Sequence, residues 1–252
     1  MLGAEAGGKP EVPEGMAALC ADYLLQVYSE VKTNPKEPLK VMAVLRLQNL
    51  SRTEMAARFE VDVPDTPEVS LVHNARFEKP ALALKPGQAG SHQLLFVFAA
   101  APTAAAVVRG TIHYMHKKAK EKSAHKEALA FELALPLSLF VAPLSVSKET
   151  LAGIIKGGGL TAVNVQAKVA PARASEAPAM IDHVTKELLH IEPVQGTSGR
   201  ALFYGKTTGG CHVAMMVRDK VANEGYLQFE LKCSGPKTVA ESLAAQLREL
   251  KL

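Results

Sequence analysis

The hydrophobic pattern of this chain changes once, near Leu135, and this change constrains the fold more than any other feature. Before it, short apolar and β-branched runs are separated by Pro, Gly and Asn, and no helical period is present. Phe59, Val61 and Val63 alternate with charged residues, which is the pattern of a strand with one buried face. After Leu135, helical periodicity appears and alternates with strands. The sequence therefore predicts two compact parts of different class.

The first part, residues 18–135, is predicted to be an immunoglobulin-like β-sandwich. Several short strands separated by turn residues are typical of that fold. The expected strands cover residues 23–32, 39–49, 57–63, 69–73, 94–99, 106–116 and 128–135. Residues 1–17 are rich in Gly, Pro and Glu, and we interpret them as a linker or hinge remnant of a longer chain.

The second part, residues 136–252, is predicted to be an α+β platform, in which helices flank an antiparallel sheet. Ser147 is expected to cap a helix that ends at Gly157, and a second helix is expected to begin near Pro178. Strands are expected at 161–170, 201–206, 212–218 and 225–232, and the last three are expected to form an antiparallel meander joined by turns rich in Gly and Asn.

A helix is expected to close the chain. Thr238 and Glu241 have the spacing of a capping box, in which the first side chain caps the helix and the second reaches back. Leu243, Leu247 and Leu250 follow at helical spacing.

Composition excludes several classes of protein. The 29 basic and 25 acidic residues are spread along the chain, which disfavours a nucleic-acid-binding surface. Three cysteines without a CxxC pair indicate neither a disulfide framework nor a zinc site, and fit a reducing, cytosolic setting. No run approaches the 18 or so apolar residues that a membrane span needs. The chain is expected to be soluble.

No motif of catalysis or cofactor binding is complete. The segment from Gly205 to Thr208 resembles the end of a P-loop, but Arg200 stands where the first glycine is required, so a hairpin turn is preferred. His113 and His116 are three apart on an expected strand, which places them on opposite faces and disfavours a metal site. We therefore expect no enzyme activity, no cofactor and no metal.

One segment is densely basic, and two interpretations of it remain open. It contains Lys117, Lys118, Lys120, Lys122 and Lys126, between two expected strands. Lysines near an anionic membrane surface contribute about 1 kcal/mol each, so the segment could contact lipid. The alternative, a solvated hairpin loop, is favoured because no amphipathic helix accompanies the lysines.

Several segments resemble the appendage, or ear, domains of adaptins. They are residues 128–135 leading through Leu137 and Phe140 into 151–155, residues 206–211 before a hydrophobic strand, and residues 227–234 before a leucine-rich helix. Within that family the similarity is closest to the delta subunit of adaptor protein complex 3, and it covers about residues 19–252.

This resemblance implies a non-catalytic function. An appendage of a coat-complex large subunit recruits accessory or regulatory proteins during sorting from Golgi and endosomes to lysosome-related organelles. Its partners would be those proteins and, through a preceding part of a longer chain, the other adaptor subunits. Its location would be cytoplasmic and peripheral on Golgi, endosomal or vesicle membranes. The alternative function is an anionic-lipid binding module acting through residues 117–126.

The resemblance also indicates a candidate binding surface. Platforms of this family hold aromatic peptides with a tryptophan on the first helix and a nearby basic residue, but this chain has no Trp. The residues at the matching places are Leu151, Ile154, Ile155, Lys156, Met215 and Arg218. They form an apolar groove or, equally, part of the core.

Overall fold

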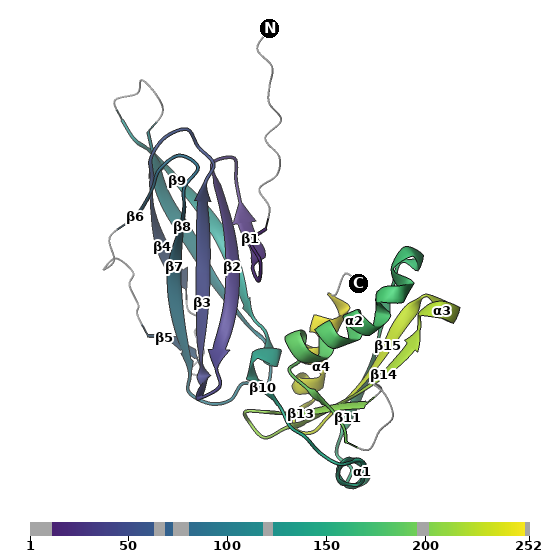
Figure 1. The fold of residues 1–252 in the computed structure, drawn as a ribbon. Helices are drawn as coiled ribbons and strands as arrows, with labels where there is room; N and C mark the ends of the chain where they lie inside the picture. Colours follow the sequence, from purple (N-terminus) through teal and green to yellow (C-terminus); the bar gives the residue numbers. More distant parts are fainter. Residues whose placement is uncertain (1–11, 63–68, 73–80, 118–122, 196–201, 250–252) are drawn as a thin grey trace. The chain divides into compact units, whose positions relative to one another are not determined.

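The computed structural model describes residues 12–62, 69–72, 81–117, 123–195 and 202–249. The chain is mainly β, a β-sandwich followed by an α/β platform, which confirms the predicted fold class (Figure 1). Two compact units are present: Met1–Lys32 with Val41–Val97 and Val107–Leu133, and Thr33–Lys40 with Phe98–Ala106 and Ala134–Leu252. Division at Leu135 into independently folding domains stays a prediction.

The strands of the sandwich form two antiparallel sheets. One has the order β1-β2-β3-β7-β5, from Ala17–Ala21, Leu25–Asn34, Glu37–Asn49, Ala89–Phe98 and Val69–Leu71. The other has the order β6-β4-β8-β9, from Leu82–Leu84, Met55–Asp62, Ala106–His116 and His125–Leu135. Alternate side chains from both sheets are buried, among them Leu45, Phe96, Ile112 and Phe131. Period-two burial therefore produces the core, as the sequence predicts.

The differences from the expected strands have simple causes. Strands β1 and β6 were not expected, because they are short and hold few β-branched residues. Strand β7 begins at Ala89 instead of residue 94, since its first half alternates small and polar side chains such as Ser91. Val63 and the end of the expected strand 69–73 lie outside the described residues.

Asn49 joins three segments of the first unit. Its buried side-chain nitrogen donates to the carbonyl oxygens of Thr53, Leu84 and Lys85, at 2.9, 3.0 and 3.2 Å. Its side-chain oxygen accepts from the backbone N–H and the hydroxyl of Ser51. An amide with both ends satisfied inside a core is a structural group, because any loss leaves backbone groups unpaired.

The second unit is built on one sheet with the order β10-β13-β14-β15-β11, and β12 also pairs with β13. The strands are Val141–Pro143, Leu202–Thr207, His212–Lys220, Tyr226–Cys233, Thr161–Lys168 and, for β12, Glu192–Pro193. The helical segments are η1 (Leu137–Phe140), α1 (Lys148–Lys156), η2 (Pro171–Glu176), α2 (Ala177–Asp182), η3 (His183–Leu188), α3 (Val221–Glu224) and α4 (Lys237–Arg248). The expected β13-β14-β15 meander is present.

The two faces of this sheet are covered differently. Alternate residues of the central strands, such as Met215 and Phe229, are buried on one face, and α4 contacts β11 and β15. Helix α4 itself buries Val239, Ala240, Leu243, Ala244 and Leu247. The other face carries α1 near β13 and mostly polar residues beyond it, among them Arg218, Gln228 and Glu230. A sheet with one deeply buried face and one partly open face results.

Two local predictions in this unit are wrong in detail. The capping box does not form: α4 begins at Lys237 after Pro236, no side chain caps it, and Glu241 instead pairs with Lys237 at 2.8 Å. The link from β14 to β15 is the helical turn α3, not a simple turn, and it ends at Gly225 with a φ of 74°.

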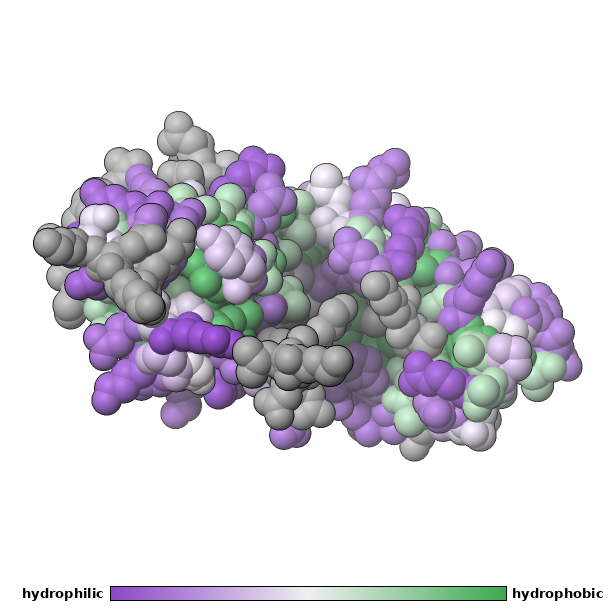
Figure 2. Space-filling view, turned by 90° about the horizontal axis from the view of Figure 1, so that it is seen from above, coloured by the Kyte–Doolittle hydropathy of each residue, from purple (hydrophilic) through white to green (hydrophobic). Residues whose placement is uncertain are grey.

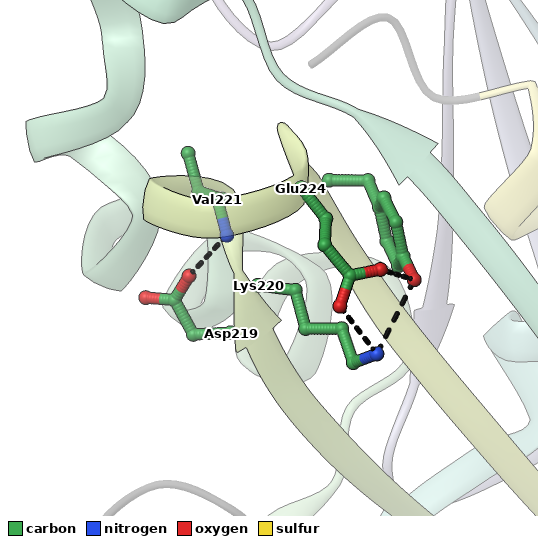
Figure 3. A network of polar contacts seen from close by, with 5 residues as sticks. Asp219, Lys220, Val221 and Glu224 are labelled. Carbon is green, nitrogen blue, oxygen red and sulfur yellow. Dashed lines mark hydrogen bonds and ion pairs between the residues drawn. The ribbon is translucent and has the colours of Figure 1, made fainter.

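A polar network fixes this helical turn (Figure 3). Asp219 accepts from the backbone N–H of Val221 at 2.9 Å. The Lys220 ammonium lies 2.8 Å from a Glu224 carboxylate oxygen, and the Tyr226 hydroxyl donates to the other oxygen. The pKa of Lys220 is raised and that of Glu224 lowered, in each case first by the hydrogen bond between them. The network is exposed and stabilises a corner of the sheet.

Candidate functional site

Helix α1 forms as its sequence predicts. The Ser147 hydroxyl accepts a hydrogen bond from the Thr150 backbone N–H at 3.2 Å, so it caps the helix. Gly158 and Gly159 follow the helix with φ of 76° and 73°, which stops its continuation. The first helix of the platform is therefore placed by local signals.

The apolar face of α1 is divided between core and surface. Leu151 is buried in a cluster with Val194, Tyr204 and Ala214, and Ile154 packs against this cluster while half-buried. Ile155 is 36% exposed, and Lys156 is exposed. From the sequence, these residues could form either a groove or part of the core. In the structure Leu151 belongs to the core and Ile155 lies at the surface.

The structure does not bring all the candidate residues together. Met215 is 0% exposed, and since side chains alternate along β14 it lies on the face opposite Ala214, which packs under α1. Arg218 is exposed on the α1 side of the sheet and pairs with Glu230 at 3.5 Å. Met215 therefore cannot contact a ligand beside α1, whereas Ile154, Ile155, Lys156 and Arg218 stay candidate contacts.

A concave site lies elsewhere in the second unit. It is a pocket of about 640 Å³. All its lining residues belong to that unit: Thr33, Pro35, Pro38, Leu139, Phe140, Val141, Ala142, Pro143, Lys186, His190, Ile191, Glu192 and Thr208. Pockets of 300–1,000 Å³ with an apolar lining and few polar groups are typical of binding sites.

Its walls are fixed by backbone contacts. The Phe140 carbonyl oxygen accepts from the Thr208 N–H at 2.7 Å and from the Thr208 hydroxyl at 3.1 Å. Gly205 packs under Ile191: a Cβ at position 205 would lie 2.7 Å from the Ile191 side chain and 2.9 Å from the Ala142 carbonyl oxygen. Gly205 is thus a close-packing position of a strand, not part of a phosphate loop.

The polar groups of the pocket suit binding better than catalysis. Lys186 and Glu192 lie on exposed positions, and Lys186 is 3.7 Å from Asp182. His190 has a φ of 51°, a conformation that non-glycine residues rarely adopt. No cysteine lines the pocket, and no serine does. An apolar side chain of a partner can enter it.

Sequence reasoning missed this pocket because its lining comes from four separated segments of the chain. Each segment alone looks like a turn or a short strand. Pro35, Pro38 and Pro143 are a weak signal, since proline is found at surface turns and at sheet edges in any fold.

The basic segment is only partly described. Lys117 and Lys126 are exposed, and Lys118, Lys120 and Lys122 lie outside the described residues. His113 and His116 point to opposite faces of β8, as predicted: His113 is exposed and lies 3.0 Å from Glu60, whereas His116 is 3% exposed.

Reactive chemistry is not favoured by the described residues. Burial raises the pKa of Cys233 to about 12 and, with Asp22 as a second cause, that of Cys20 to about 11. Both thiols are therefore protonated near neutral pH and are poor nucleophiles. Among the residues that the structure describes, no three His, Cys, Asp or Glu side chains are grouped to hold a metal ion. No helix in the described ranges is long and apolar enough to cross a membrane.

Apolar residues at the surface are scattered. In Figure 2, green apolar residues reach the surface in small areas bordered by purple hydrophilic ones. Among the described residues, the most exposed large apolar side chain is Tyr23, and those exposed in the second unit are Leu144 and Ile155. Binding through pockets and short apolar strips fits this surface better than one broad apolar interface.

The fold is a β-sandwich followed by an α/β platform, and its pockets have the size and apolar lining that are typical of binding sites. A scan against protein-family models finds no match, and a search among curated proteins finds none.

Several solved structures are distantly similar to about half of this chain. The GAE domain of yeast GGA1 is 16% identical with a TM-score of 0.34, covering 47% of this chain and 97% of that one. The GAE domain of GGA2p from Saccharomyces cerevisiae is 16% identical with a TM-score of 0.35, covering 47% and 96%. A PapD-like domain of human CEP192 is 16% identical with a TM-score of 0.25, covering 53% and 94%.

Proposed function

We propose that this chain is a non-catalytic appendage that recruits accessory proteins through its second unit. The observation that carries the proposal is the 640 Å³ apolar pocket, whose rim holds few charged groups. Burying one apolar side chain there would contribute about 1.5–3 kcal/mol, which suits weak, reversible capture of a short peptide segment.

The cellular setting of the proposal comes from the sequence. The segments that resemble adaptin appendages, with the order of sandwich and platform, support an appendage on the large subunit of a vesicle-coat adaptor complex. Within that family, the same segments favour the delta subunit of adaptor protein complex 3. Its partners would be accessory or regulatory proteins and the other adaptor subunits. Its place would be the cytoplasmic side of Golgi, endosomal or transport-vesicle membranes, in sorting to lysosome-related organelles.

Helix α1 provides a second surface for the same function. Ile155 and Lys156 are exposed on this helix and Ile154 is half-buried beside them, and Arg218 lies on the α1 side of the sheet. Without a tryptophan this surface offers less aromatic contact area, so its peptides would differ from those of the better-known platforms.

The experiment is selection of binding peptides from a displayed library of disordered protein segments, followed by affinity measurement with fluorescence polarisation. Ala142→Arg places a long charged side chain at the pocket, and we expect it to weaken the selected peptides at least tenfold, because the arginine would block the apolar lining. Ala222→Arg, on the exposed side of α3, is the matched control and should change nothing.

Ile155→Arg separates the two surfaces. If Ile155→Arg weakens peptide binding and Ala142→Arg does not, the binding site is at α1, and the proposed recruiting function still holds. Failure to select any peptide, or affinities that neither substitution changes, would contradict the proposed function.

A further inference from the structure

A second concave surface lies on the first unit, at one end of its four-stranded sheet. It is a groove of about 520 Å³. Its lining comes from three neighbouring strands and the residues beside them: Glu54, Met55, Ala56, Ala83, Leu84, Lys85, Gln88, Met115, His116, Lys117 and Ala124. The recruiting function does not use this surface.

Strand register places small and apolar residues in one row of this surface. Ala56 is opposite Ala83 of β6 on one side and opposite Met115 of β8 on the other. Their inward neighbours Met55, Leu84 and His116 are buried, so the row belongs to the outer face of the sheet. Met115 is 44% exposed.

Strand β9 extends the row with a lysine. Arg109 pairs with Glu132 at 2.7 Å, and the rings of His116 and His125 stack with centroids 5.6 Å apart. Both pairs fit one antiparallel register of β8 and β9, in which Met115 lies opposite Lys126. The row from Ala83 to Lys126 spans three strand spacings, about 14 Å.

The adjacent row carries charge. The same registers place Glu54 between Lys85 and Lys117, so two lysines flank one carboxylate. Within the described ranges, none of Lys85, Lys117 and Lys126 forms an ion pair. Three cations against one anion leave a net positive charge around an exposed methionine.

From this arrangement we infer that the outer face at this end of the sandwich docks on an anionic phospholipid membrane. The lysines contact lipid phosphates, and Met115 enters the interfacial layer between them. A membrane fits better than an acidic peptide, because the exposed Met115 beside the cations offers an apolar contact to the lipid layer that a chain of carboxylates would not use. This inference does not depend on peptide binding by the second unit.

The test is flotation of the whole chain with vesicles of phosphatidylcholine alone or with 30 mol% phosphatidylserine (about a third anionic lipid, as in cytoplasmic leaflets). We expect binding that requires phosphatidylserine. The combined change Lys85→Gln, Lys117→Gln and Lys126→Gln should weaken it about 100-fold, since each lysine contributes about fivefold near an anionic surface. Met115→Ser should weaken it about fivefold.

Glu54→Gln is the decisive variant. Removing the one carboxylate of the adjacent row should strengthen vesicle binding about fivefold, because that carboxylate is repelled by lipid phosphates. The control for the triple lysine variant lowers the net charge by the same amount elsewhere, through Lys148→Gln, Lys168→Gln and Lys237→Gln on exposed positions of the second unit.

Several results would overturn the inference. They are absence of phosphatidylserine-dependent binding, an equal loss in the control, and no gain with Glu54→Gln. Displacement of the vesicles by millimolar free phosphoserine would identify a soluble phosphate site instead. Capture of a soluble hexaglutamate peptide by the same lysines, without vesicle binding, would identify an acidic-peptide site.

Discussion

At the scale of single residues, burial decides chemistry more than residue type does. Asn49 is part of a glycosylation sequon by sequence, yet its amide is buried and holds three carbonyl groups. Tyr114 is buried and donates to Asp22 at 2.5 Å, and burial followed by that hydrogen bond raises its pKa. Both polar side chains are structural groups of the sandwich.

Cys233 makes the stability of the chain sensitive to alkaline pH. Its pKa is raised from 9.0 to about 12, first by burial and then by Cys211. A raised pKa in the folded state gives stability that is complete below pH 9 and is lost between about pH 9 and 12, at up to about 1.4 kcal/mol per pH unit. Cys233→Val should therefore show a shallower loss in urea unfolding measured at pH 8, 9, 10 and 11. Parallel curves for the two proteins would contradict this cause.

At the scale of helices and strands, the space around a glycine shows how closely its neighbours pack. In β8, a Cβ at Gly110 would lie 2.5 Å from the Phe131 ring and 2.7 Å from the Glu60 carbonyl oxygen. In α1, a Cβ at Gly153 would meet nothing within 4 Å. The same substitution should thus have opposite effects in the two elements.

We expect Gly110→Ala to lower the free energy of unfolding by about 1–3 kcal/mol, because the added methyl would collide with Phe131 of β9 and with the backbone of β4, the two neighbours of β8 in its sheet. Gly153→Ala should raise it by about 0.5–1 kcal/mol, because alanine restricts the unfolded chain and favours a helix. Urea denaturation followed by circular dichroism measures both. Equal signs for the two variants would mean that the packing around Gly110 is looser than the structure shows.

At the scale of the whole molecule, two cores should give two unfolding events. Each unit buries its own apolar residues, with Phe96 in the first and Leu243 in the second. Calorimetry should resolve two transitions. Gly110→Ala should lower the temperature of one, and Leu243→Ala, which empties a buried position at a cost of about 2–5 kcal/mol, should lower the other.

The exposed change Ala222→Arg serves as the control and should move neither transition. A single transition that shifts alike in both core variants would show that the units unfold as one, and the predicted division at Leu135 would then be wrong.

Local sequence patterns determined the positions of many helices and strands of this protein. Alternation of apolar and polar residues predicted most strands of the sandwich, and Ser147 with the glycines after Lys156 predicted α1, because these patterns act over a few residues. The missed strands β1 and β6 and the capping box at Thr238 show the limit: short edge strands and helix starts depend on their neighbours.

Tertiary structure alone decided the surfaces. Met215 and Arg218 are three apart on one strand and so lie on opposite faces, but only the packed sheet decides which face is core and which is surface. The 640 Å³ pocket of the second unit and the row from Ala83 to Lys126 are each built from segments that are distant along the chain. A linear pattern does not encode which strands become neighbours, so it could place the elements but not the sites between them.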